Sequence, residues 1–299
     1  LSYWVLEQDS SRAYIQFQQV KPMLDCFERW FGPYPFAADG YKLVQAPFLG
    51  MEHQSAIAYG NDFMNGYRGQ DLSGTGRGKL WDYIIVHESA HEWFGNNITT
   101  ADIADMWVHE GFADYAEAIY TQCQQGDEAG NDYVIGLRNN IQNDRPVIGP
   151  YGVNEEGSGD MYYKGANLLH TIRHIMGDDE AFHNVFLYMY KMWSHGIVTS
   201  AQVEALFSEQ SGLDLTKVFD QYLRTTMVPR LEYRVKSKHF EYRWANCVEG
   251  FTMPVRVTAE GNLYIWLPTP EWTTAPETVG KKAKVEVDLN WYITVKGPR

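Results

Sequence analysis

The chain has 299 residues, a formal net charge of −13 and 44% hydrophobic residues. The acidic balance argues against nucleic acid as a partner, because phosphates would repel the chain, and it mildly favours cationic ligands such as free amino termini. No apolar run is long enough to span a membrane, and the length suits one large domain or a large domain plus a small one. We therefore expect a soluble globular protein.

The cysteines and the N-terminus bear on the compartment. Cys26, Cys123 and Cys247 are far apart and lack the spacing of a metal site, so we expect three free, buried thiols. The segment that starts at Leu1 has neither the basic start nor the cleavage site of a signal peptide. A chain that starts with leucine can be an excised piece, so the sequence does not decide between a cytoplasmic and an exported protein.

The first 80 residues contain a predicted helix, two strands and a loop. Apolar residues recur near a helical period from Arg12 to Phe31, which predicts an amphipathic helix that ends at residues 32–35, Gly-Pro-Tyr-Pro. Residues 41–46 have the pattern of a strand, and residues 51–59 predict an edge strand that lines a cleft. Residues 60–78 are rich in Gly, Asn and Asp and predict a loop, without the spacing of a phosphate-binding loop.

A metal-binding motif follows at residues 87–91, His-Glu-Ser-Ala-His. Two histidines four positions apart on a helix project from one face, one turn apart, so both imidazoles can bind one metal ion. Glu88 stands beside a ligand, where it can act as the general base of a zinc hydrolase. We expect Gly95 to close this helix. Apolar side chains seat the helix in a core: Tyr83, Ile84, Val86 and Trp93.

The third metal ligand is predicted on the next helix. Catalytic zinc takes three protein ligands and leaves one position open for water. Glu110 lies 19 positions after His91 (110 − 91), which leaves room for a helix end, a turn and a return. Asp114 and Glu117 follow on the same helical face, where carboxylates that orient ligating imidazoles are expected. The sequence therefore predicts one Zn²⁺ per chain, held by His87, His91 and Glu110.

These residues carry a family resemblance. The His-Glu-x-x-His pair and the later Glu in Trp-x-x-Glu-Gly-Phe resemble the gluzincin metallopeptidases of the aminopeptidase N and leukotriene hydrolase type. Residues 50–54, Gly-Met-Glu-His-Gln, resemble the family's Gly-x-Met-Glu-Asn exopeptidase motif. Residues 162–165, Tyr-Tyr-Lys-Gly, resemble its Tyr-x-Lys-Gly segment. The four motifs stand in the family's order, and the resemblance covers roughly residues 15 to 230.

The resemblance implies substrate-binding residues on the predicted edge strand. Glu52 matches the glutamate that binds the free α-amino group of the substrate, and Gly50 and Met51 belong to the same substrate-binding motif. A carboxylate near the metal prefers a substrate with a charged amine, which is the physical basis of exopeptidase selectivity. The sequence departs from the family at His53, where the family has asparagine, so the role of His53 stays open.

The resemblance also implies a catalytic tyrosine. Tyr162 aligns with the tyrosine whose hydroxyl donates to the oxyanion of the tetrahedral intermediate, and Tyr163 is its rival. His170 and His174 stand four apart, but Thr171 follows the first where a metallopeptidase motif has glutamate, so we interpret this pair as a polar helix face. His109, which precedes Glu110, is either a bystander or a donor to a metal ligand.

The remaining pattern predicts helices and then strands. Helices are expected at about residues 128–141, 166–176, 182–192, 200–211 and 215–223, with a cap at Thr199 and a break at Gly212. Beyond Arg230 the apolar residues alternate, most regularly from Val285 to Val295, which predicts a small β module. With the resemblance, this gives an α+β fold: a thermolysin-like zincin catalytic domain at residues 1–228, followed by an all-β sandwich at residues 229–299. The family also places a β-rich domain before the catalytic one, and we expect it to be missing from this chain.

We therefore predict a zinc aminopeptidase that acts on peptides with a free N-terminus, with Glu88 and Tyr162 as catalytic residues. A zinc endopeptidase with the same core would lack the amine anchor Glu52. Leukotriene-type epoxide hydrolysis follows only from the resemblance, since nothing in the sequence marks a lipid pocket. A catalytically silent metal-bound scaffold is the third alternative, and the presence of Glu88 and Tyr162 argues against it.

Overall fold

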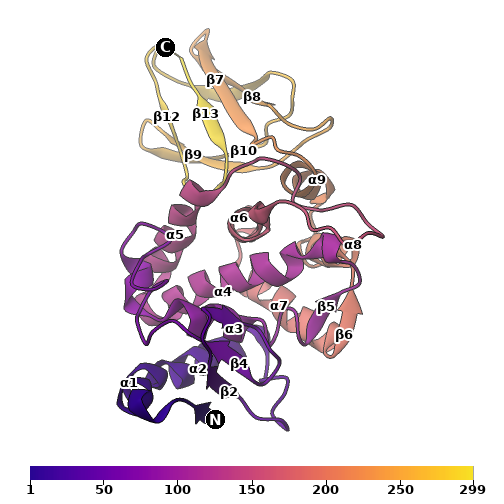
Figure 1. Ribbon diagram of the computed structural model, residues 1–299. Coiled ribbons are helices and arrows are strands. Elements are labelled where there is room, and N and C mark those ends of the chain that lie inside the picture. Colours follow the sequence, from indigo (N-terminus) through magenta and orange to yellow (C-terminus); the bar gives the residue numbers. More distant parts are fainter. Residues whose placement is uncertain (299) are drawn as a thin grey trace.

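The computed structural model describes residues 1–298 as a helical part with a small N-terminal sheet, followed by a β part that ends the chain (Figure 1). None of the helices in residues 1–298 has the length and apolar character that a membrane crossing requires. The N-terminal sheet has the order β1-β2-β4-β3, in which β3 alone runs antiparallel to its neighbour. Its strands are β1 Ser2–Trp4, β2 Lys42–Gln45, β3 Gly50–Met51 and β4 Ile57–Tyr59.

The segment predicted as one helix before the sheet is helical throughout. It consists of α1 (Ser10–Gln16), a 3-10 turn (Phe17–Gln19) and α2 (Val20–Phe31). Gly32 ends α2 with a φ of 95°, a conformation that favours glycine over residues with a Cβ. The edge strand expected at residues 51–59 is only partly correct: β3 is at the edge of the sheet but ends at Met51, and β4 (Ile57–Tyr59) lies between β2 and β3.

Two helices at the centre of the molecule carry the metal-binding motif. These are α3 (Tyr83–Ala90) and α4 (Trp107–Gln125), and all eight residues of α3 are buried. Asp82 caps α3, because its Oδ1 accepts from the backbone N–H groups of Ile84 and Ile85 at 3.1 and 3.3 Å. The expectation that α3 runs to Gly95 is wrong: regular helix ends at Ala90, and a turn leads to Gly95, whose φ is 129°.

The remaining helices pack around α4 (Figure 1). The predicted helices are confirmed with small shifts at their ends, and Thr199 forms a capping box with Gln202. A short parallel pair, β5 and β6, joins the segment before α4 to the segment between α7 and α8. The elements are α5 Asp127–Gly136, α6 Tyr163–Met176, α7 Asp179–Trp193, α8 Ser200–Ser211, α9 Thr216–Arg224, β5 Ile98–Thr100 and β6 Gly196–Val198.

The C-terminal strands form two sheets, with the orders β10-β9-β12 and β11-β8-β7-β13. The stacked rings of Trp266 and Tyr242, 4.3 Å between centroids, join the two sheets. The strands are β7 Arg230–Lys236, β8 His239–Ala245, β9 Val255–Ala259, β10 Asn262–Trp266, β11 Thr273–Thr278, β12 Val285–Val287 and β13 Thr294–Lys296. The alternating pattern from Val285 to Val295 is not one continuous strand, because the turn around Asp288 and Asn290 divides it between the two sheets.

The cysteine expectation is also corrected. Cys26 of α2 and Cys123 of α4 form a disulfide with their Cα atoms 6.2 Å apart, and Cys247 is the free cysteine. The two positions are separated by 97 residues in sequence, so no local pattern indicated the pairing. The disulfide ties the last turns of α4 to the helix that packs beside it.

Candidate active site

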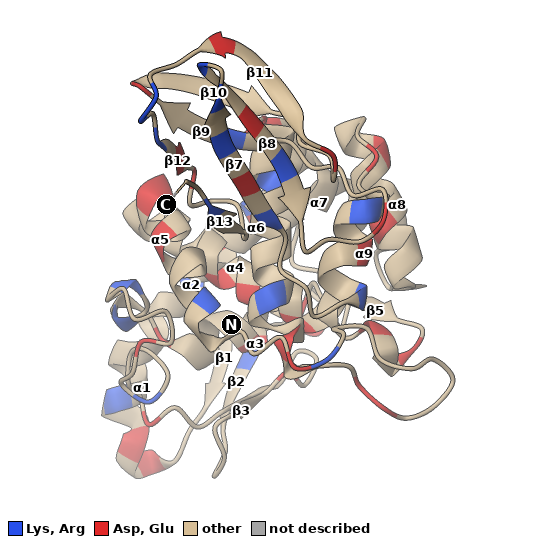
Figure 2. Ribbon diagram, turned by 90° about the horizontal axis from the view of Figure 1, so that it is seen from above, with Lys and Arg blue, Asp and Glu red and all other residues tan. Residues whose placement is uncertain are grey.

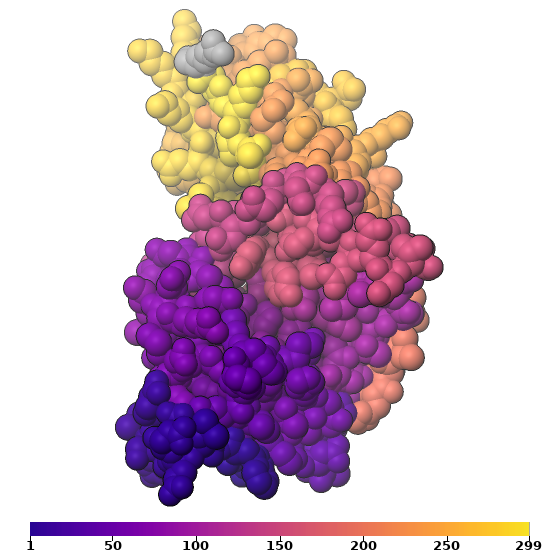
Figure 3. All heavy atoms as spheres, in the orientation of Figure 1, coloured from indigo at the N-terminus to yellow at the C-terminus, as the bar shows by residue number. Residues whose placement is uncertain are grey.

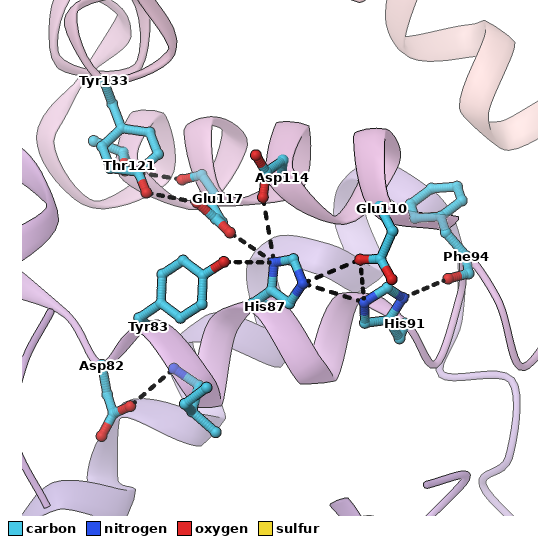
Figure 4. Close-up of polar contacts among 11 residues, drawn as sticks. Asp82, Tyr83, His87, His91, Phe94, Glu110, Asp114, Glu117, Thr121 and Tyr133 are labelled. Atoms are coloured by element: carbon cyan, nitrogen blue, oxygen red, sulfur yellow. Dashed lines mark hydrogen bonds and ion pairs between the residues drawn. The ribbon is translucent and has the colours of Figure 1, made fainter. Parts of the chain in front are cut away.

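The predicted metal ligands converge at the centre of the molecule (Figure 4). His87 and His91 lie one turn apart at the end of α3, with 3.3 Å between their Nε2 atoms. Glu110, in the first turn of α4, places Oε2 3.4 Å from His87 Nε2 and 3.3 Å from His91 Nε2. All three residues are buried, so the three donor atoms form a nearly equilateral triangle inside the protein.

This triangle fits a zinc ion. Zn²⁺ binds imidazole nitrogen at about 2.0–2.1 Å and carboxylate oxygen at about 2.0–2.2 Å, so the donors of a tetrahedral site lie roughly 3.3–3.5 Å apart. Glu110 Oε2 is buried and has no hydrogen-bond partner within residues 1–298, which leaves it free for a cation. Burial alone would raise the pKa of Glu110, but the neighbouring imidazoles bring it well below its ordinary value, so the carboxylate is ionised.

The far nitrogens of both imidazoles have acceptors. His91 Nδ1 lies 3.0 Å from the carbonyl oxygen of Phe94, and His87 Nδ1 lies 2.7 Å from Glu117 Oε1. An acceptor at Nδ1 selects the tautomer that presents the lone pair of Nε2 to the metal. The structure brings both predicted carboxylates to His87 rather than to His91, with Asp114 Oδ1 at 3.5 Å from His87 Nδ1.

Glu88 lies between the metal donors and the edge strand β3. Its side chain is buried, and burial raises its pKa above the ordinary value for glutamate. A Cβ atom built on Gly50 would lie 2.8 Å from Glu88 Oε1 and 2.8 Å from Ile84 Cγ2. Because β3 approaches α3 so closely, only glycine fits at this position without a shift of the neighbouring atoms.

Glu52 follows β3 and is fixed by the turn beyond α3. Its carbonyl oxygen accepts from Asn96 Nδ2 at 2.8 Å. Burial is the main cause that raises the pKa values of Glu88 and Tyr162, and the Glu52 carboxylate adds to it. Met51 is 42% exposed and the side chain of His53 is exposed to solvent. Gly50 therefore lies against Glu88, and the backbone of Glu52 is held beside the turn after α3, whereas the side chain of His53 is exposed at the surface.

A cavity of about 480 Å³ opens beside Glu88 and His87. Tyr162 and Tyr163 both line it, as do Leu49, Tyr67, Leu72, Tyr83 and Ile84. The ring of Tyr162 lies 6.0 Å from that of His87, and burial and then the Glu110 carboxylate raise the pKa of Tyr162. Burial also raises the pKa of Tyr163, followed there by Asp114 and Glu117. Tyr162 is therefore the tyrosine nearer to the metal donors.

The other histidines lie outside the triangle. His109 Nε2 accepts from the backbone N–H of Thr100 at 3.0 Å, and burial lowers the pKa of His109 to about 4. The interpretation of His170 and His174 as a polar helix face is wrong. His170 is 1% exposed, and its Nε2 lies 2.9 Å from Asn290 Oδ1, because the β part covers this side of α6.

Sequence reasoning missed several residues that face the site. Tyr83 stacks on His87 with 5.1 Å between ring centroids, and Tyr133 of α5 donates to Glu117 Oε2 at 2.5 Å. Tyr83 precedes His87 by four positions, a spacing that signals a shared helical face. No sequence signal marked Tyr67, Leu72 or Tyr133, which reach the site from the loop at residues 60–76 and from α5.

Comparisons with known proteins assign the family. The profile of the Peptidase family M1 domain matches residues 15–222. Human endoplasmic reticulum aminopeptidase 2 is 24% identical over 207 residues, which are 64% of this chain and 21% of that protein. Aminopeptidase N of Lactococcus lactis subsp. lactis is 29% identical over 161 residues, 49% of this chain and 19% of the relative.

A solved structure has the same fold. The M1 zinc metallopeptidase of Deinococcus radiodurans, bound to a Tyr-Ser-Ala substrate, superposes with a TM-score of 0.55 and 24% identity, covering 75% of this chain and 46% of that one. The chain thus spans less than half the length of each of these three proteins. The profile match covers most of the sequence, and the chain belongs to peptidase family M1.

Proposed function

We propose that this chain is the catalytic part of a zinc-dependent aminopeptidase that releases N-terminal residues from peptides. The observation that carries the proposal is the close approach of Gly50 to the carboxylate of Glu88, because it puts the strand that precedes Glu52 beside the proposed general base. A general base, a metal site and an amine-binding carboxylate within one cleft are the groups that aminopeptidase chemistry needs.

The proposed residues divide the reaction among them. His87, His91 and Glu110 hold the zinc ion, which when bound polarises the scissile carbonyl and lowers the pKa of a water molecule. Glu88 takes the proton of the attacking water and passes it to the leaving amine. Tyr162 donates a hydrogen bond to the oxyanion of the tetrahedral intermediate. Asp114 and Glu117 orient His87.

Glu52 supplies the selectivity for free amino termini. Its carboxylate binds the substrate α-ammonium group in a charge-assisted hydrogen bond, and Gly50 and Met51 shape the strand that presents it. A peptide whose amino group is blocked loses this interaction and also buries a carboxylate without a partner. The family supports peptides with a free N-terminus as substrates, because the Deinococcus radiodurans structure was determined with a Tyr-Ser-Ala substrate.

The cavity beside Glu88 accepts the side chain that follows the scissile bond. Glu52 is anchored to Asn96 beyond the C-terminal end of α3, whereas Tyr83 and Ile84 border the cavity at the N-terminal end of this helix. We infer that the amine anchor and the cavity lie on opposite sides of Glu88, with the chain of the substrate between them. Aromatic and aliphatic walls favour apolar side chains.

We further propose the division into domains that the sequence indicated. Residues 1–228 form the thermolysin-like catalytic domain, and the two C-terminal sheets at residues 229–299 form a β-sandwich. One Zn²⁺ is bound per chain. The family's preceding β-rich domain would provide another wall of the cleft.

Two variants test the activity. Peptide anilides with free and with acetylated N-termini are assayed with the parent, Glu52→Ala and Glu88→Gln proteins. We expect cleavage only of the free substrates, loss of that preference with E52A, and a loss of about 10²–10⁴ in kcat with E88Q at unchanged zinc content. Equal cleavage of both substrates by the parent would favour an endopeptidase, and an E88Q protein as active as the parent, or a parent without activity, would favour a metal-bound scaffold.

A further inference from the structure

The Nδ1 atom of His87 faces more than one side chain that can accept its proton. Glu117 Oε1 lies 2.7 Å away, Asp114 Oδ1 lies 3.5 Å away and the Tyr83 hydroxyl lies 3.4 Å away (Figure 4). All three are buried, so no bulk water competes for this nitrogen. Which carboxylate accepts the proton decides how the imidazole ring is turned, and therefore where its Nε2 lone pair points.

The two carboxylates differ in what holds them. The second oxygen of Glu117 accepts from the hydroxyl of Tyr133 at 2.5 Å, so both of its oxygens are engaged. Neither side-chain oxygen of Asp114 has a hydrogen-bond partner within the described residues. A carboxylate fixed at both oxygens cannot rotate away from the imidazole, whereas no hydrogen bond within the described residues holds the Asp114 carboxylate in one orientation.

Tyr133 is itself fixed by its surroundings. It comes from α5, is 1% exposed, and its ring lies 5.2 Å from that of the fully buried Trp81. The hydrogen-bonded series Tyr133–Glu117–His87 therefore joins α5, α4 and α3 in one buried line (Figure 4). The helix α5 provides none of the proposed metal ligands. It provides Tyr133, which fixes Glu117, the hydrogen-bond partner of the ligand His87.

We propose that Tyr133 is a positioning residue of the metal site: its hydroxyl fixes Glu117 as the acceptor for His87 Nδ1 and thereby orients His87 Nε2 toward the ion. This inference rests on the proposed zinc site formed by His87, His91 and Glu110. It assigns to Tyr133 a role in metal affinity that does not depend on contact with substrate.

The test is the zinc affinity of metal-free protein, measured by competition with a chromogenic chelator. Tyr133→Phe removes one oxygen atom and keeps the ring that packs on Trp81. We expect its zinc Kd to rise about three- to tenfold, toward the lower end of the effects seen when outer partners of metal ligands are removed. The matched control is Tyr120→Phe, because Tyr120 is 2% exposed, packs on the same Trp81 at 6.2 Å and stays outside the series; its Kd should stay unchanged.

A double-mutant cycle separates positioning from packing. If Tyr133 acts through Glu117, Y133F should have little further effect on zinc Kd in an E117A background, which removes both hydrogen bonds of this side chain. Near-UV circular dichroism of each metal-free variant verifies that the fold is kept. A Y133F protein that binds zinc as the parent does, or one that weakens binding equally in both backgrounds, would overturn the inference while leaving the proposed function intact. A folded parent protein that binds no zinc would overturn both.

Discussion

Gly50 of the edge strand lies directly against the carboxylate of Glu88, with only 2.8 Å between Glu88 Oε1 and the position a Cβ atom would occupy. The strand that presents the proposed amine anchor and the helix that presents the proposed general base are therefore in backbone-to-side-chain contact. Glycine at this position lets the two lie close enough to act on one peptide bond.

Adding one methyl group at this contact should impair catalysis without loss of metal. In a Gly50→Ala protein, Glu88 and Ile84 must move to admit the new atom, and displacement of a catalytic group by about 1 Å can cost roughly a hundredfold in rate. We expect kcat to fall between about tenfold and a hundredfold, with the zinc content of the parent. Gly159→Ala is the control, because its Cβ would meet no atom within 4 Å. A G50A protein with full kcat would contradict the proposed geometry.

The cavity beside Glu88 should select the residue that follows the cleaved bond. Leu72→Trp fills part of the space of about 480 Å³, so it should lower cleavage of peptides with Phe or Leu in the second position more than of peptides with Gly or Ala there. We expect the ratio of kcat/KM values to change about tenfold, as expected for lost apolar contacts in a pocket. The ratio is measured on one protein sample, so partial unfolding cancels. If the change appears instead in the preference for the first residue, the cavity has been assigned to the wrong side.

Removing zinc should destabilise the protein. The ion binds the folded triangle of His87, His91 and Glu110 but has no assembled site in the unfolded chain, so a zinc concentration of about 1,000 times Kd adds about 4 kcal/mol to the free energy of unfolding. We expect a chelator to lower Tm and equimolar Zn²⁺ to restore it, as followed by calorimetry. In Glu110→Gln the chelator effect should shrink. A Tm that does not respond to the chelator, in protein shown to contain zinc, would contradict this prediction.

Reduction of the disulfide should weaken the folded state. Cys26 and Cys123 close a loop across 97 residues of sequence, and disulfides of this kind stabilise by about 2–4 kcal/mol, mainly by restricting the unfolded chain. We expect urea unfolding with a reductant to show a loss in this range. Thiol titration of the unfolded chain should give one free thiol before reduction and three after it. Cys247→Ser is the control and should respond to the reductant as the parent does; three thiols before reduction would rule out the pairing.

Acid should destabilise the junction between α6 and the β part. Burial lowers the pKa of His170 well below its ordinary value and that of His174 to about 4. The unfolded chain then binds these protons more readily than the folded one, so the stability is fully present above about pH 6.5 and is lost as the pH falls through about 4. Charged groups that face the pair are Arg138, Arg173, Arg256, Asp179 and Asp288.

The measurement is the free energy of unfolding between pH 7 and 4. Each buried histidine that titrates contributes a slope of up to about 1.4 kcal/mol per pH unit. His170→Asn should flatten the slope, because it removes one of the two imidazoles whose pKa burial lowers. A parent slope identical to that of H170N would mean that other groups, such as buried carboxylates, determine the acid response.

Much of the local structure could be predicted from the residues themselves. Helical periodicity and capping residues predicted α6 to α9 closely, because these signals act within a few positions of the chain. The four-residue spacing of His87 and His91 placed both imidazoles on one face before any fold was known. The regular alternation from Val285 to Val295 did not indicate that β12 ends at Val287, because the alternation continues through the turn in which Asn290 N–H donates to Asp288 Oδ1.

The sequence by itself determined which chemical groups were present, the periodicity of each element and, through the order of the motifs, the family. The tertiary structure decided what depends on segments far apart in the chain. It set the distances from Glu110 to the two imidazoles, joined Cys26 to Cys123, and chose Glu117 over Asp114 as the nearer partner of His87. The reason is physical: spacing fixes direction within one helix, but the distance between two helices depends on all the side chains packed between them.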